Sequence, residues 1–238
     1  MTKIPYNINV DVAEGLQNEA ALFPYLYACN IACGAHAGDL EEMKRVVHLA
    51  EEHNVQIGAH PSYPDREHFG RRPMKMEENA LYDTIANQIE KLNTLLQQPL
   101  HHVKAHGALY HNTAHQKEQA KILLDVLCTE FSGVQLFTLP YSELENQALS
   151  RGVKVCREAF LDRHYLTRDQ LVDRSHSEAL LNHTQSVCDQ FKQLTQHQRV
   201  LTKKGHWANL TADTFCLHGD HPKVLDFLKA IHDITNTI

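Results

Sequence analysis

The sequence lacks the motifs of several common enzyme classes. It contains no GxxxxGK[ST] loop and no GxGxxG after a predicted strand, so a standard nucleotide-binding loop is not expected. A GxSxG elbow, an HExxH helix and a CxxC pair are also missing. These absences argue against a serine hydrolase of that type, a thermolysin-like protease and a paired-cysteine zinc site. No apolar run of about 18 residues occurs, so no transmembrane helix is predicted.

Charge and cysteine content exclude further classes. The 238 residues carry a formal net charge of −6, whereas nucleic acids and anionic membranes favour basic surfaces. No apolar segment follows Lys3, so we expect no secretory signal and a cytoplasmic protein. The six cysteines are then expected to be reduced thiols, most of them in the core.

Strand-like and helix-like segments alternate along the chain, which predicts a parallel sheet built from β–α units. The predicted strands are 7–12, 28–33, 55–60, 101–106, 134–139, 153–157 and 214–218. The predicted helices are 39–53, 77–97, 114–131, 142–151, 177–195 and 221–235. No linker or repeat interrupts this pattern, so we expect one domain over residues 1–238.

Each predicted strand has one apolar and one polar face. Val103 and Ala105, for example, alternate with His102, Lys104 and His106. Strands covered by helices on both sides should instead be apolar throughout. An open sheet with one face exposed to solvent remains an alternative, but the pattern favours a β/α barrel with a polar interior or polar upper layers.

Active sites of such barrels lie at the carboxyl ends of the strands. Several residues at these ends have side chains that can take part in catalysis or binding: Asp11, His36, His60, Lys104, His106, Glu158, His218 and Asp220. A histidine next to glycine recurs among them, and packing alone does not explain this recurrence. Two structural roles are alternatives to a catalytic one. Lys104 can form an ion pair with Asp11 or Glu158, and Asp39 and Asp220 can cap the helices that follow them.

Other residues receive weaker assignments. Arg71 and Arg72 are adjacent without acidic neighbours, which suits a carboxylate or phosphate ligand, although a surface pair is equally expected. Gly58 should leave space beside His60. Six histidines are interpreted as solvated: His48, His53, His68, His183, His197 and His232.

The motifs NIACGAHAGD, IGAHPSYPD, FGRR, VKAHGALY, LDRHY, LVDR and CLHGD occur in this order. Together they resemble the LamB/YcsF family, from about Asn7 to the last helix. Three departures stand out. Asn7 replaces the first Asp of a motif like DLNCDLGE, Ala35 replaces Phe in GFHAGD, and His111 replaces Asn in KPHGALYN.

The resemblance implies a distorted seven-stranded β/α barrel of the glycoside hydrolase/deacetylase type, with mainly parallel strands. It also implies ATP-dependent opening of 5-oxoproline (pyroglutamate) to glutamate, together with two partner subunits, B and C, of 5-oxoprolinase. We expect the catalytic residues to be Asp11, His36, His60, Lys104 and His106. Asp11 and His60 would act as base and orienting partner, His36 or His106 as acid, and Lys104 as a charge stabiliser. Substrate contacts are assigned to Glu14, Asn30, Arg71, Arg72, Tyr110, Arg163, His218 and Asp220.

Two other functions remain open at this stage. A metal-dependent deacetylase or amidohydrolase could bind a divalent ion through Asp11, His36 and His60, as related deacetylase barrels do with an Asp and two His. A non-catalytic regulatory subunit is the second alternative.

Overall fold

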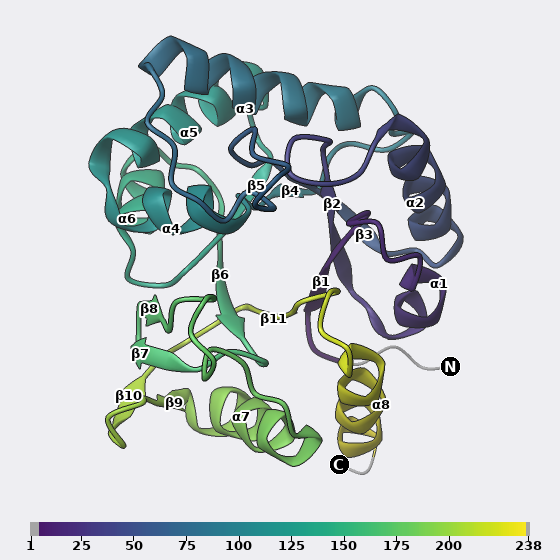
Figure 1. Cartoon of the computed structure of the whole chain (residues 1–238), viewed down its shortest axis with the longest axis vertical. Coiled ribbons are helices and arrows are strands. Elements are labelled where there is room, and N and C mark those ends of the chain that lie inside the picture. Colours follow the sequence, from purple (N-terminus) through teal and green to yellow (C-terminus); the bar gives the residue numbers. More distant parts are fainter. Residues whose placement is uncertain (1–4, 237–238) are drawn as a thin grey trace.

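The computed structural model describes residues 5–236 and contains a closed barrel of seven parallel strands (Figure 1). Their order around the barrel is β1-β11-β6-β5-β4-β3-β2, so the first strand pairs with both the second and the last. The strands are β1 (Ile8–Val12), β2 (Ala28–Ala32), β3 (Gln56–His60), β4 (His102–Val103), β5 (Gln135–Thr138), β6 (Val155–Phe160) and β11 (Thr214–Leu217). The predicted fold class and all seven predicted strands are confirmed.

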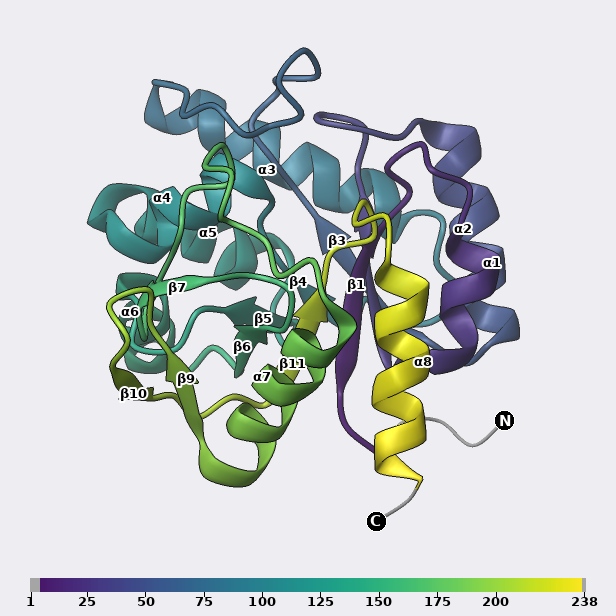
Figure 2. The ribbon, with the colours of Figure 1, turned by 60° about the horizontal axis from the view of Figure 1, so that its bottom comes forward.

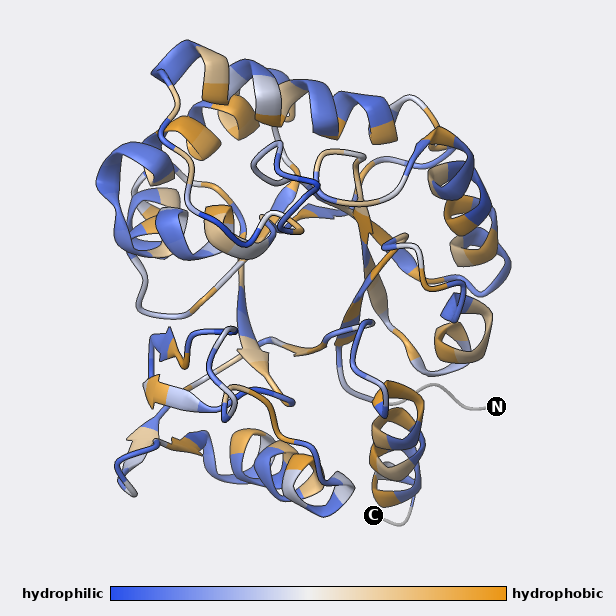
Figure 3. Ribbon diagram, in the orientation of Figure 1, coloured by the Kyte–Doolittle hydropathy of each residue, from blue (hydrophilic) through white to orange (hydrophobic). Residues whose placement is uncertain are grey.

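Helices surround the barrel, as two views of the ribbon show (Figures 1 and 2). They are α1 (Glu19–Leu22), the 3-10 turn η1 (Phe23–Tyr25), α2 (Leu40–Glu52), α3 (Glu78–Asn93), α4 (Gly107–His115), α5 (Lys117–Glu130), α6 (Glu143–Ser150), α7 (Thr184–His197) and α8 (Val224–Thr235). Hydrophobic and hydrophilic residues alternate along these helices (Figure 3). Their apolar sides pack on the outward face of the strands, which is the amphipathic pattern expected of a covering layer.

The beginning of α2 confirms the predicted helix cap. The Asp39 side chain accepts a hydrogen bond of 2.9 Å from the backbone N–H of Glu42. The cap predicted at Asp220 is wrong, because α8 begins only at Val224 and its N-cap is Lys223. Asp220 therefore has another function in the loop after β11.

Several element boundaries differ from the prediction. Strand β4 is only two residues long. The chain then turns into α4 at Gly107, which has a φ of +54°. The helix predicted at 114–131 is two helices, α4 and α5, and the helix predicted at 177–195 begins at Thr184. Two small hairpins were not predicted: β7 (Tyr165–Thr167) with β8 (Gln170–Leu171), and β9 (Arg199–Leu201) with β10 (Trp207–Asn209).

The barrel interior has an apolar floor and polar upper layers. Ala28, Phe137 and Cys156 form a small separate cluster at the lower level, and the His102 ring stacks on Phe137 with centroids 3.8 Å apart. Gly58 faces this His102 ring, and a Cβ at position 58 would overlap it. The space left by Gly58, which was expected beside His60, is occupied by the His102 ring.

None of the helices within residues 5–236 is both long and apolar enough to cross a membrane.

Candidate active site

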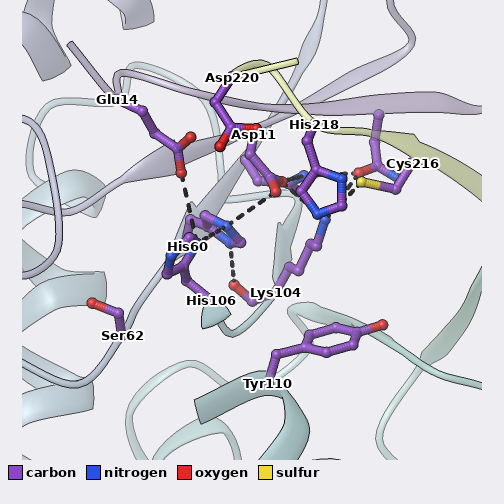
Figure 4. Close-up of polar contacts among 12 residues, drawn as sticks. Asp11, Glu14, His60, Ser62, Lys104, His106, Tyr110, Cys216, His218 and Asp220 are labelled. Carbon is purple, nitrogen blue, oxygen red and sulfur yellow. Dashed lines mark hydrogen bonds and ion pairs between the residues drawn. The ribbon is translucent and has the colours of Figure 1, made fainter. Parts of the chain in front are cut away.

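A cavity of about 540 Å³ opens at the carboxyl ends of the strands. Nine of the predicted site residues line it: Asp11, His60, Arg71, Arg72, Lys104, His106, Tyr110, Arg163 and His218. The close-up in Figure 4 shows Asp11, His60, Lys104 and His218 close together, although they come from β1, β3, the segment after β4 and the loop after β11. Glu14, Asn30, His36 and Asp220 lie next to this group without lining the cavity.

Lys104 lies at the centre of the polar upper layers of the barrel. Its Nζ is 2.9 Å from Asp11 Oδ1, 3.0 Å from Glu158 Oε1 and 3.1 Å from Cys216 Sγ. Burial alone would lower the pKa of Lys104, but neighbouring groups, Asp11 foremost, hold that pKa well above its usual value. Both ion pairs considered from the sequence therefore form. Through these two ion pairs, Lys104 has a structural role in the barrel interior.

Asp11 is ionised in this environment. Burial would raise the pKa of its carboxyl group, but the charges of His60 and Lys104 together hold the pKa well below its usual value. Asn30 Nδ2 donates to Asp11 Oδ1 at 2.7 Å and to Asn9 Oδ1 at 2.8 Å. The Asn30 side chain is fully buried beneath Asp11. The assignment of Asn30 as a substrate contact is wrong, because the residue orients Asp11 from below.

Beside Asp11, four ligand-type side chains converge from the ends of four strands, β1 to β4. Glu14, His36, His60 and His106 each offer one N or O atom, and these four atoms all lie within 4.8 Å of one another. The group can hold a metal ion. It differs from the predicted set of Asp11, His36 and His60, since Asp11 is engaged by Lys104 and Asn30 while Glu14 and His106 join the two histidines.

His218 and Asp162 form a second pair at the opposite side of the cavity. His218 Nδ1 lies 2.9 Å from Asp162 Oδ1, and the backbone N–H of His218 donates to Asp162 Oδ2 at 3.0 Å. Burial lowers the pKa of His218, although Asp162 opposes this shift. The imidazole is therefore neutral at physiological pH, oriented by a carboxylate and in contact with the cavity. Asp162 was not singled out from the sequence, although the LDRHY motif contains it.

Arginines surround the entrance of the cavity. The Arg71 and Arg174 guanidinium groups each donate to one oxygen of Asp220 at 2.6 Å. The expectation that Arg71 lacks an acidic neighbour is wrong, because Asp220 arrives from the distant loop after β11. Arg72 lies beside Arg71 on the cavity wall and is exposed to solvent.

Arg163 and Tyr110 are fixed by the protein itself. Arg163 is buried and donates to the carbonyl oxygen of Val172 at 2.5 Å, while the Tyr110 hydroxyl donates to Glu158 at 2.8 Å. His68 also lines the cavity and pairs with Asp65 at 2.8 Å, so its interpretation as a solvated residue is wrong.

The three departures from the family motifs lie at different depths. Asn7 accepts a hydrogen bond from Thr214 Oγ1 at 2.9 Å, at the amino end of β1 and away from the cavity. Ala35 does not line the cavity either. His111 does, and burial lowers its pKa to about 4. Of these three departures, His111 is the one that lines the cavity. Ser175, in the segment after LVDR where the family usually has Pro-Gly, also lines it.

Comparisons with known proteins agree with this architecture. The sequence profile of the LamB/YcsF family matches residues 6–237. The crystal structure of a lactam utilization protein from Thermus thermophilus has 30% sequence identity and a TM-score of 0.90, over 98% of this chain and 96% of that one.

Two more distant structures share the fold alone. A putative cellobiose-phosphate cleavage protein from Enterococcus faecalis has 14% identity and a TM-score of 0.56, over 98% of this chain and 95% of that one. A GH113 β-1,4-mannanase has 8% identity and a TM-score of 0.56, over the full length of both chains.

The fold and the cavity define a β/α-barrel protein with an ionisable site at the carboxyl ends of its strands. The chain belongs to the LamB/YcsF family.

Proposed function

We propose that this protein opens the lactam ring of 5-oxoproline to give L-glutamate, in an ATP-dependent reaction with two partner subunits of the 5-oxoprolinase B and C type. The observation that carries the proposal is the likeness, over 98% of the chain, to a structure described as a lactam utilization protein. The six free cysteines, five of them buried, suit a reducing cytoplasmic location, where ATP is also available.

The dependence on ATP follows from the chemistry of the substrate. An unstrained lactam is a poor electrophile, so water needs an activated carbonyl carbon. The sequence has no standard nucleotide-binding loop, and we therefore assign the transfer of the ATP γ-phosphate to the lactam oxygen to the partner subunits.

His218 is the side chain best placed to activate water. Its Nδ1 is bonded to Asp162, which leaves Nε2 for a water molecule in the cavity. His218 would accept a proton as the water oxygen bonds to the activated carbon. The ring C–N bond then breaks as protonated His218 returns its proton to the nitrogen, which leaves as the α-amine. A second water releases phosphate from the resulting acyl phosphate.

This assignment changes the roles expected from the sequence. Asp11, which is held ionised by its neighbours, is a weak base, and Lys104 already lies within 3.1 Å of three acceptors. His36 does not line the cavity and cannot reach the leaving nitrogen directly. Arg72, together with the Arg71–Asp220–Arg174 group, is placed to receive the substrate carboxylate at the entrance.

An omission experiment tests the proposal. Labelled 5-oxoproline is incubated with ATP, this protein and both partner subunits, and each component is left out in turn. Glutamate should form only when all are present. Glutamate formation without this protein would contradict the proposal. Formation by this protein alone without ATP would favour a simple amidohydrolase instead.

A further inference from the structure

Two of the clustered histidines have their outer ring nitrogens fixed as donors. His60 Nδ1 lies 2.8 Å from the carbonyl oxygen of Lys104, and His106 Nε2 lies 2.9 Å from the carbonyl oxygen of Phe69. A carbonyl oxygen can only accept, so both nitrogens carry the proton. In the neutral rings, His60 Nε2 and His106 Nδ1 therefore present lone pairs.

His36 is fixed in the same way through a hydroxyl group. The Ser62 hydroxyl donates its only proton to the carbonyl oxygen of Tyr63 at 2.9 Å. Ser62 Oγ must then accept from His36 Nδ1, which lies 2.9 Å away. The lone pair of His36 is consequently on Nε2, which points toward Glu14.

The four inner atoms form a close group of acceptors. His60 Nε2 and His106 Nδ1 are 3.0 Å apart, His36 Nε2 and Glu14 Oε1 are 3.2 Å apart, and His106 Nδ1 and Glu14 Oε1 are 3.6 Å apart. A cation between these atoms would pair with all of the inward lone pairs at once, including that of neutral His60 Nε2, which also lies 3.5 Å from Asp11 Oδ2.

We infer that Glu14, His36, His60 and His106 form a binding site for one divalent cation of the Zn²⁺ class. A tetrahedral ion with bonds of about 2.0–2.1 Å sets its ligand atoms about 3.3 Å apart, and the three distances above bracket that value. Three imidazoles and one carboxylate suit Zn²⁺ or a neighbouring transition metal, whereas Mg²⁺ and Ca²⁺ prefer oxygen ligands.

The surroundings of the four ligands support the same conclusion. Metal-bound histidines commonly donate their second N–H to a carbonyl or another polar group, as all three histidines do here. Glu14 supplies the single carboxylate of the group. A cation at the centre would keep this carboxylate ionised. Figure 4 shows Glu14, His60 and His106 turned toward one another.

Metal binding can be measured on the purified full chain without substrate, ATP or partner subunits. The protein is stripped with a chelator and titrated with Zn²⁺ in competition with a chromophoric chelator. We expect one ion per chain and a higher melting temperature in the loaded protein. Replacement by Co²⁺ should give the intense visible absorption of a four-coordinate site. Failure to bind Zn²⁺ would overturn the inference of a metal site. It would not contradict the proposed lactam reaction, so the two proposals can be distinguished.

Variants locate the ion. Glu14→Gln and His106→Gln should each bind Zn²⁺ at least about 100-fold more weakly, since each removes a ligand. Ser62→Ala leaves the ligands in place but removes the acceptor of His36, and a loss of about 10- to 100-fold is expected. His115→Ala removes a histidine of the same cavity that lies outside the group, and should bind like the wild type.

Circular dichroism and the melting temperature establish that each variant is folded. If a ligand variant does not fold, the Zn²⁺ affinity of Ser62→Ala tests the site instead, because this variant keeps all four ligands. Wild-type affinity in Ser62→Ala and in the folded ligand variants would contradict the proposed site.

Discussion

Lys104 is an ammonium group buried between two buried carboxylates, those of Asp11 and Glu158. Desolvation makes such a residue costly by itself, and its partners offset that cost only while all three stay charged. The alternation of side chains along the predicted strand placed Lys104 inside the barrel, with these two acids as candidate partners. The sequence therefore predicted this part of the site well.

Replacing Lys104 by Met tests the ion pairs. Removing one partner of a buried pair should lower the free energy of unfolding by about 3–5 kcal/mol near pH 7. Lys104 helps hold the pKa of Asp11 below its usual value, so in the variant that pKa rises. The cost should then shrink as the pH falls and the acids take up protons. Chemical denaturation at several pH values measures this.

The matched control is Lys44→Met, which removes an exposed pair with Glu41 and should cost less than about 1 kcal/mol. An equal loss of stability for Lys104→Met at pH 5 and pH 7.5 would contradict the role of the buried charges.

The pH profile of the reaction reports on His218. Its pKa is lowered by burial, and its neutral form is the proposed base. Activity should fall only as the pH drops through this lowered pKa, so the acid limb of kcat/KM lies below pH 6.5. Asp162→Asn removes the opposing charge, which should move the limb to still lower pH and reduce kcat about 100-fold or more. An acid limb that does not move in Asp162→Asn would exclude His218 as the titrating base.

The sequence predicted individual site residues better than their contacts. His36, His60 and His106 were found because each follows a strand next to a glycine or a small residue. Their convergence with Glu14 depends on the loops after β1 and β2, whose path the strand pattern does not specify. The contact between His218 and Asp162 joins residues 56 positions apart and was missed for the same reason.

At the scale of the elements, strand β3 contains a glycine that leaves space for a neighbouring ring in the barrel interior. Gly58 pairs with His102 of β4, and the His102 ring fills the space that a side chain at position 58 would occupy. His102 Nε2 in turn lies 2.7 Å from Asn30 Oδ1, which connects the floor of the barrel to the support of Asp11.

Gly58→Ala should therefore lower the free energy of unfolding by about 1–3 kcal/mol through overpacking. The effect should be smaller in a Gly58→Ala/His102→Ala background, where the ring is absent, because the two sites are in contact. Thermal and chemical denaturation of the single and double variants measure this coupling. Independent, additive losses would argue against the packing of Gly58 on His102.

Alternating faces, strand number and the α2 cap were predicted because they depend on local sequence. The boundary between α4 and α5, the short β4 and the two hairpins depend on tertiary packing. For example, the β7–β8 hairpin is held in part by the Tyr165 hydroxyl, which accepts a hydrogen bond from the Phe160 N–H at 2.7 Å. No periodicity within residues 165–171 could have indicated that contact.

At the scale of the whole molecule, loops after three different strands meet at the cavity entrance through Arg71, Arg174 and Asp220. Asp220 neutralises one of the two arginines with which it pairs, and Arg72 adds a further positive charge beside them. The entrance is consequently cationic on a protein whose net charge is −6. An acidic substrate is favoured there over a neutral one.

Arg72→Ala should raise KM for 5-oxoproline about 10-fold or more, since a charge-assisted hydrogen bond is lost. The inhibition constant of the same five-membered lactam without a carboxylate should not change. Steady-state kinetics of the assembled enzyme provide both values. An equal change for both ligands would place the carboxylate elsewhere.

The central claim is that the cavity of this chain carries out ring opening while the partners activate the lactam. The most direct measurement compares glutamate formation by the partner subunits and ATP with three forms of this protein: wild type, His218→Ala, and His48→Ala as an exposed control on α2. The claim predicts wild-type rates for His48→Ala and a rate at least about 100-fold lower for folded His218→Ala. A wild-type rate of glutamate formation with His218→Ala would contradict it.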